Sequence, residues 1–127
     1  MNKYVYYLIG LVFLAGVVFL IVTPGKPGQY DGFAQCIKDS GTTFYGTFWC
    51  PHCQSQKALF GRSVKLLPYV ECSTPDGQGQ LQVCKDAGVT SYPTWQFNAS
   101  TTDRLTGEVP LAKLAEKTGC TLPVISE

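Results

Sequence analysis

The sequence predicts an α/β fold, in which a sheet of about four strands is flanked by helices and preceded by one transmembrane helix. Residues 4–22 form an uncharged run of 19 residues. At the rise of an α-helix such a run spans roughly 28 Å, which matches the hydrocarbon core of a bilayer. After this run, segments rich in β-branched and aromatic residues alternate with segments of helical character, which is typical of a sheet covered by helices.

The composition limits the chain to one modest domain. It has 127 residues, of which 15% are charged, and a formal net charge of +1. Because a nucleic-acid-binding surface needs an excess of basic residues, we expect no nucleic acid partner.

Three parts are expected along the chain. Residues 1–22 form an N-terminal transmembrane signal anchor, residues 23–29 a linker rich in proline and glycine, and residues 30–127 a small folded domain. A cleaved signal peptide is the alternative, but its apolar core is usually only about 7 to 15 residues long and is followed by a small-x-small cleavage site. The run here is longer and no such site follows it, so a retained anchor is favoured.

Two features place the folded domain outside the cytoplasm. Lys3 and the terminal amine outweigh Lys26 on the other side of the apolar run, which by the positive-inside rule favours a cytoplasmic N-terminus. The chain also has six cysteines, a density that is ordinary where disulfides persist. We therefore expect a single-pass membrane protein with a periplasmic or cell-surface domain.

The first elements of the domain alternate between helix and strand. Residues 33–39 have the pattern of a short amphipathic helix. Residues 42–49, TTFYGTFW, are β-branched and aromatic, which favours a buried strand. A helix should then begin at Pro51, whose missing N–H costs nothing in a first turn, and end at Gly61.

Residues 64–71, VKLLPYVE, form the second expected strand, with Pro68 indicating a bulge or a sheet edge. Strand, helix and strand in this order predict a right-handed parallel crossover. The remaining expected elements are a helix over residues 81–87 ended by Gly88, strands at 94–97 and 104–106, and a helix over 110–119 with Leu111, Leu114 and Ala115 on one face. The aromatic residues expected in the core are Phe44, Phe48, Trp95 and Phe97.

The segment FWCPHCQ places Cys50 and Cys53 at the junction between a strand and a helix. Cys50 would face the unpaired N–H groups of the first helical turn and share that turn with His52. Both features favour a thiolate, which is the form that attacks disulfides. Cys53 lies one turn deeper on the same face, where it could close a disulfide with Cys50. The pair therefore provides an attacking sulfur and a resolving sulfur.

Two other uses of this pair are weaker. A closed zinc site needs four ligands, and Cys72 and Cys84 are not spaced as a second CxxC, so no metal is expected. A purely structural disulfide between Cys50 and Cys53 would close a very short loop and stabilise little. Redox chemistry explains the pair best.

Two motifs together resemble the thioredoxin superfamily. Trp49-Cys50-Pro51-His52-Cys53 follows a strand and opens a helix, and about forty residues later Gly88-Val89-Thr90-Ser91-Tyr92-Pro93-Thr94 resembles the cis-proline loop of that superfamily. Within it, FWCPHCQSQKALFG, PYVEC, SYPTW and LAEKTGC resemble the small domain fused to, or encoded as a partner of, bacterial vitamin K epoxide reductase homologues. The resemblance, from about residue 42 to 119, implies a minimal thioredoxin-like fold with a central mixed sheet of about four strands.

The resemblance also implies catalytic roles. Cys50 would be the nucleophile and Cys53 the resolving thiol, while Pro51 and His52 between them would tune the redox couple.

For substrate binding, the resemblance implies Trp49, Tyr92 and Pro93, with a cis peptide bond between the last two. The main-chain groups of Tyr92 would then be offered to an extended substrate peptide. Thioredoxins commonly bury an acidic residue in the strand before the first cysteine. Phe44 occupies that position here, which argues against a fast general reductase.

The four other cysteines, Cys36, Cys72, Cys84 and Cys120, allow three pairings, among which the sequence alone does not choose. We expect Cys72–Cys84, which would pin the intervening loop to the following helix, and Cys36–Cys120, which would join the ends of the domain. Such structural disulfides would stabilise a domain with a small core. The alternative is a shuttle pair that passes electrons to Cys50 and Cys53.

The sequence therefore predicts a membrane-anchored thiol–disulfide oxidoreductase that oxidises proteins with free or mispaired cysteines outside the cytoplasm. Its redox group would be the Cys50–Cys53 disulfide, with no bound cofactor. The resemblance implies re-oxidation by a quinone-linked membrane partner of the vitamin K epoxide reductase type. Two alternatives remain, a reductase or isomerase that is kept reduced, and a non-catalytic module that binds peptides.

Overall fold

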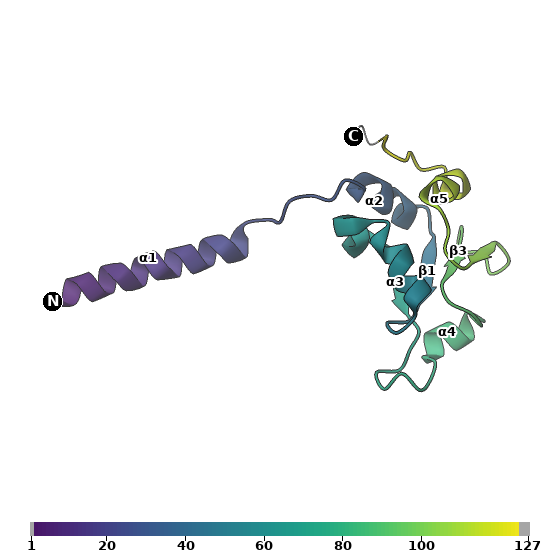
Figure 1. Ribbon diagram of the computed structural model, residues 1–127, viewed down its shortest axis with the longest axis horizontal. Coiled ribbons are helices and arrows are strands. Elements are labelled where there is room, and N and C mark those ends of the chain that lie inside the picture. Colours follow the sequence, from purple (N-terminus) through teal and green to yellow (C-terminus); the bar gives the residue numbers. More distant parts are fainter. Residues whose placement is uncertain (1, 125–127) are drawn as a thin grey trace.

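The computed structural model describes residues 2–124 (Figure 1). Residue 1 of the expected anchor and residues 125–127 of the expected domain lie outside this range. The division of the chain into anchor, linker and domain stays a prediction. The helices and strands are α1 (Lys3–Val22), α2 (Asp31–Asp39), β1 (Thr43–Gly46), α3 (Pro51–Ala58), the 3₁₀ helix η1 (Gly61–Leu66), β2 (Tyr69–Glu71), α4 (Gln82–Asp86), β3 (Thr94–Gln96), β4 (Arg104–Thr106) and α5 (Leu111–Thr118).

The four strands form one mixed sheet in the order β2-β1-β3-β4. β1 runs parallel to β2 and antiparallel to β3, which in turn is antiparallel to β4. β2 is an edge strand, as Pro68 indicated, and the parallel β1–β2 pair is joined through α3. The α/β prediction, with a mixed sheet of about four strands and an apolar helix before it, is confirmed and is consistent with a minimal thioredoxin-like fold.

The first strand is shorter than predicted. β1 ends at Gly46, and the chain then turns, with the N–H of Cys50 donating to the carbonyl of Thr47 at 3.3 Å. The turn carries the backbone out of the sheet so that Cys50 can precede α3, and it leaves the Phe48 side chain 49% exposed. The prediction that Phe48 lies in the core is therefore wrong.

The second predicted strand is also shortened. Of residues 64–71 only the last three pair with β1, while Gly61–Leu66 form a 3₁₀ helix and α3 already ends at Ala58. Pro68 has no N–H to donate to a neighbouring strand. In the 3₁₀ helix the backbone groups form hydrogen bonds with one another instead, as the N–H of Leu67 does with the carbonyl of Val64 at 3.1 Å.

Two hydrophobic clusters lie on opposite faces of the sheet, because neighbouring strand residues point to opposite sides. Phe44 points into the larger cluster and stacks on Trp95 with ring centroids 4.4 Å apart. Tyr45, next in the strand, points into the smaller cluster. Phe97 is also fully buried, as predicted. Leu114 of α5 is buried in the larger cluster, and Leu111 and Ala115 pack against it, which confirms the predicted face of this helix.

Both expected structural disulfides are present. Cys36 of α2 bonds to Cys120 just after α5, with Cα atoms 5.9 Å apart, and Cys72 bonds to Cys84 of α4, with Cα atoms 5.6 Å apart. The first joins the two ends of the folded domain, and the second joins the end of β2 to α4.

Among the described residues one helix, α1, is long and apolar enough to cross a membrane. None of its residues is buried by the rest of the chain, and Figure 1 shows it projecting away from the folded domain.

Candidate active site

Cys50 occupies the position immediately before α3, with Pro51 in the first turn of that helix. The N–H of Cys53 donates to the Cys50 sulfur at 3.3 Å, so the side chain caps one of the orphan donors at the helix start. On the other side the Cys50 thiol contacts the main-chain carbonyl of Tyr92 at 3.9 Å. The sulfur is thus set between a helix N-terminus and the loop that carries Pro93.

Cys53 has a different environment one turn deeper in the helix. Its side chain is fully buried, and it is a free thiol like Cys50. Burial, reinforced by the hydrogen bond with Cys50, raises the pKa of Cys53 to about 12. At neutral pH the Cys53 thiol of the reduced pair therefore keeps its proton.

Three side chains that were not predicted as site residues, Lys57, Tyr69 and Glu71, form a cluster beside Cys53. The Lys57 ammonium, one helical turn after Cys53, lies 3.4 Å from the centre of the Tyr69 ring on β2. The Tyr69 hydroxyl donates to Oε2 of Glu71 at 2.7 Å, and burial raises the pKa of Tyr69. Only the spacing of four residues between Cys53 and Lys57 could have indicated part of this cluster from the sequence.

Gly46 allows β1 to approach this cluster closely. A Cβ atom at position 46 would lie 2.9 Å from Cε2 of Tyr69 and 3.0 Å from Sγ of Cys53. These separations are shorter than normal van der Waals contact, so a glycine is required where β1 passes the Cys53 sulfur.

We expect Gly46→Ala to destabilise the reduced protein by about 1 to 3 kcal/mol, because the added methyl group must displace the Tyr69 ring or the Cys53 sulfur. Urea unfolding of the full chain in detergent would measure the change. Gly32→Ala is the matched control, because a Cβ atom at that position of α2 meets nothing within 4 Å. Equal stabilities of the two variants would contradict the close approach.

His52 and a buried glutamine connect α3 to the segment before α5. Nδ1 of His52, whose side chain is 72% exposed, lies 2.7 Å from Oε1 of Glu108. One turn later the fully buried Gln56 donates to the carbonyl of Val109 at 3.0 Å and accepts from its N–H at 2.6 Å. Glu108 and Gln56 were not predicted, and their partners lie more than fifty residues away in sequence.

The residues predicted to bind substrate gather around Cys50. The Tyr92-Pro93 peptide bond is cis, as expected. The Trp49 ring, 53% exposed, meets the Tyr92 ring edge to face with centroids 6.3 Å apart. Together with Phe48, which is also about half exposed, these residues place an apolar surface beside the Cys50 sulfur.

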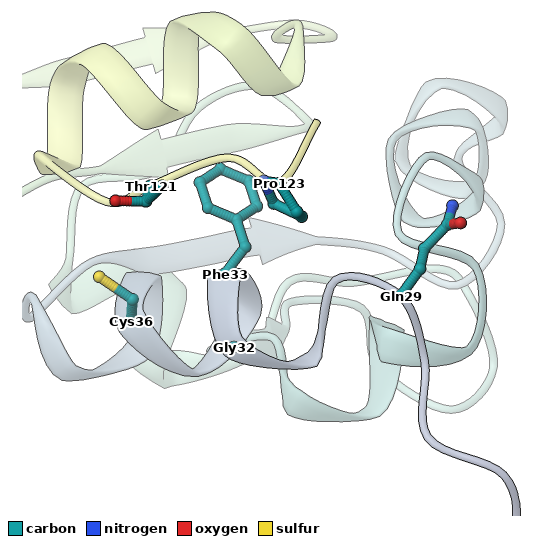
Figure 2. Close-up of a pocket in the computed structure, with 6 residues that line it drawn as sticks. All are labelled: Gln29, Gly32, Phe33, Cys36, Thr121 and Pro123. Carbon is teal, nitrogen blue, oxygen red and sulfur yellow. The ribbon is translucent and has the colours of Figure 1, made fainter. Parts of the chain in front are cut away.

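Two other features lie outside this arrangement. No group of three or more His, Cys, Asp or Glu residues within residues 2–124 could hold a metal ion. A surface pocket between α2 and the segment after α5 is shown in Figure 2, where the Phe33 side chain points toward Pro123. Of the cysteines it includes only Cys36, and neither Cys50 nor Cys53 lines it.

Comparison with curated proteins shows that this chain has relatives among the thiol-disulfide oxidoreductases. The thiol-disulfide oxidoreductase LTO1 of Arabidopsis thaliana is 43% identical over 99 aligned residues, which cover 74% of this chain. The chain spans about a quarter of the length of that relative. No protein-family model matches the sequence.

Proposed function

We propose that this chain, which belongs to the thiol–disulfide oxidoreductase family, is a membrane-anchored enzyme that oxidises protein thiols outside the cytoplasm. The observation that carries this proposal is the unequal environment of its two free thiols. Cys50 caps the start of α3, whereas Cys53 is buried with a raised pKa of about 12. The Cys50 sulfur is therefore suited to exchange with substrate, and the Cys53 sulfur to hold the proton of the reduced pair.

Exchange begins on the oxidised Cys50–Cys53 pair. A substrate thiolate attacks Sγ of Cys50, the Cys50–Cys53 bond breaks, and Cys53 leaves as a thiolate that takes up a proton. A second substrate thiolate then attacks the substrate sulfur of the mixed disulfide, which forms the substrate disulfide and releases the Cys50 thiolate. Two electrons pass from substrate to the pair. In the reverse direction, Cys53 attacks the mixed disulfide at Cys50.

The surroundings of the two sulfurs favour the oxidising direction. The Cys53 N–H donates to the Cys50 sulfur of the reduced pair, a contact that stabilises the reduced state and makes the disulfide a stronger oxidant. In either direction of exchange Cys53 passes through its thiolate, so its raised pKa makes loss of the Cys53 proton costly whichever way the electrons flow. Phe44, at the strand position where the resemblance to thioredoxins leads one to expect an acidic residue, is fully buried and cannot accept a proton.

Substrate would be held by the apolar surface around Cys50. Phe48 and Trp49 expose about half of their side-chain surfaces, and the main chain of Tyr92 reaches the Cys50 sulfur. An extended polypeptide could therefore contact aromatic rings while its cysteine meets Cys50.

Turnover requires an electron acceptor for the reduced pair. We propose a quinone-linked membrane protein of the vitamin K epoxide reductase type. The apolar helix α1 supports a membrane location, and tethering would raise the effective concentration of the domain beside such a partner.

The reduction potential of the Cys50–Cys53 pair tests the direction of electron flow. We expect the full chain in detergent, equilibrated with glutathione buffers, to have a potential above about −200 mV, whereas a reductase should lie near about −270 mV. Alkylation followed by mass spectrometry measures the fraction reduced. A Cys50→Ser variant controls for the structural disulfides, which should stay oxidised across the same buffers.

A further inference from the structure

The loop of residues 73–80, here called the rim loop, is closed at its base. Ser73 and Gln80 form an antiparallel bridge, and the N–H of Leu81 donates to the carbonyl of Cys72 at 2.7 Å. The Cys72–Cys84 disulfide lies just outside this bridge and is fully buried. The two ends of the rim loop are therefore held at a fixed separation.

These two ends bind the two aromatic residues next to Cys50. Nε1 of Trp49 donates to Oγ of Ser73 at 2.9 Å. At the other end, Nε2 of Gln80 donates to the Tyr92 hydroxyl at 2.7 Å and to the carbonyl of Val89 at 2.7 Å. Trp49 lies directly before Cys50, and the Tyr92 carbonyl contacts the Cys50 sulfur. The rim loop thus joins the two segments that meet at the attacking sulfur.

The middle of the rim loop lies against the same surface. A Cβ atom at Gly77 would lie 3.7 Å from both Cζ of Phe48 and Cδ1 of Trp49. The loop therefore lies against both aromatic residues, which stay about half exposed.

We propose that the rim loop determines substrate preference, with Gln80 as the positioning residue that holds Tyr92 beside Cys50. The preferred substrates are extended polypeptides that carry large apolar side chains next to their cysteines. Such side chains can cover the exposed rings of Phe48 and Trp49, whereas a small thiol needs only the sulfur of Cys50. This inference rests on the proposed function, because it concerns the substrates of the same site.

The test compares Gln80→Leu with Gln82→Leu in the full chain. Leucine keeps the volume of the side chain but cannot donate to Tyr92 or Val89. Gln82 is the matched control, because it lies exposed on α4 and its amide donates to Asp86 at 2.7 Å. Each variant, re-oxidised by an excess of glutathione disulfide, is assayed with dithiothreitol, with a two-cysteine peptide that has phenylalanine beside each cysteine, and with the same peptide carrying serine in place of phenylalanine.

For Gln80→Leu we expect KM for the phenylalanine peptide to rise about three- to ten-fold, the effect of losing one or two partly buried hydrogen bonds. The rate with dithiothreitol should match that of the Gln82→Leu control. An equal loss with all three substrates would overturn the proposal, because it would indicate a change in the redox pair itself. No change with any substrate would overturn it as well.

Binding without turnover separates this inference from the proposed function. Trp49 fluorescence can follow titration with the phenylalanine peptide in which both cysteines are replaced by serine. We expect Gln80→Leu to weaken this binding about three- to ten-fold even if the unmodified protein proves unable to oxidise thiols. Equal affinities of the two glutamine variants would overturn the inference, whereas absent turnover with intact binding would overturn only the oxidase function.

A double-mutant cycle tests whether Gln80 acts through Tyr92. In a Tyr92→Phe background, Gln80→Leu should raise KM for the phenylalanine peptide less than it does in the unmodified protein, because the shared hydrogen bond is already lost. Fully additive effects would show that Gln80 does not act through the Tyr92 hydroxyl.

Discussion

Cys53→Ala should arrest the protein as a mixed disulfide through Cys50, and Cys50→Ser should reduce thiol–disulfide exchange to the rate without protein. Cys50 accepts the helix N–H and keeps 5% of its surface exposed, whereas Cys53 is fully buried. Without Cys53, a bond formed at Cys50 has no internal thiol to break it. Non-reducing electrophoresis of the full chain, followed by mass spectrometry of the adduct, measures the outcome.

The identity of the trapped adduct distinguishes oxidase from reductase. The single Cys50 thiolate of the Cys53→Ala variant attacks disulfides, so an oxidase captures the disulfide of its re-oxidising partner, whereas a reductase captures substrate. A Cys53→Ala, Cys50→Ser double variant is the control and should trap neither. If Cys50→Ser binds peptide normally and keeps the biological activity of the unmodified protein, the result would instead support a non-catalytic module that binds peptides.

Removal of the Cys36–Cys120 disulfide should lower the free energy of unfolding by about 4 to 5 kcal/mol, and removal of Cys72–Cys84 by about 3 kcal/mol. The bonds close loops with sequence separations of 84 and 12 residues, and the longer loop restricts the unfolded chain more. Since small domains are stable by only about 5 to 15 kcal/mol, the first loss would leave little margin.

Urea unfolding of the two paired-alanine variants, each with the other disulfide intact, measures these losses. The order of the two effects is the decisive result, because it follows from loop length alone. A larger loss from the Cys72–Cys84 pair would contradict the loop-entropy explanation and indicate that the rim loop contributes to stability through its contacts. The Cys72–Cys84 variant should also lose preference for the phenylalanine peptide if the disulfide holds the rim loop in place.

Much of the chemistry was predictable from local sequence. Pro51 after Cys50 marks the start of a helix, so the position of both sulfurs follows from a few consecutive residues. The pairing of the four other cysteines was predicted as well, although the sequence left three possibilities open. The end of β1 at Gly46 was not predictable, because Thr47, Phe48 and Trp49 have strong strand propensity and yet lie in the turn that leads to Cys50 and α3.

The sequence by itself determined the apolar N-terminal helix, the order of strands and helices, and the two cysteines at a helix start. Periodicity, proline and glycine act within a few residues, so their effects can be seen along the chain. Only the tertiary structure decided that Glu108 meets His52, that Lys57 lies on Tyr69, and that Gln80 holds Tyr92. These contacts join residues 12 to 56 positions apart, and they exist because packing of the sheet and helices brings distant side chains to one place.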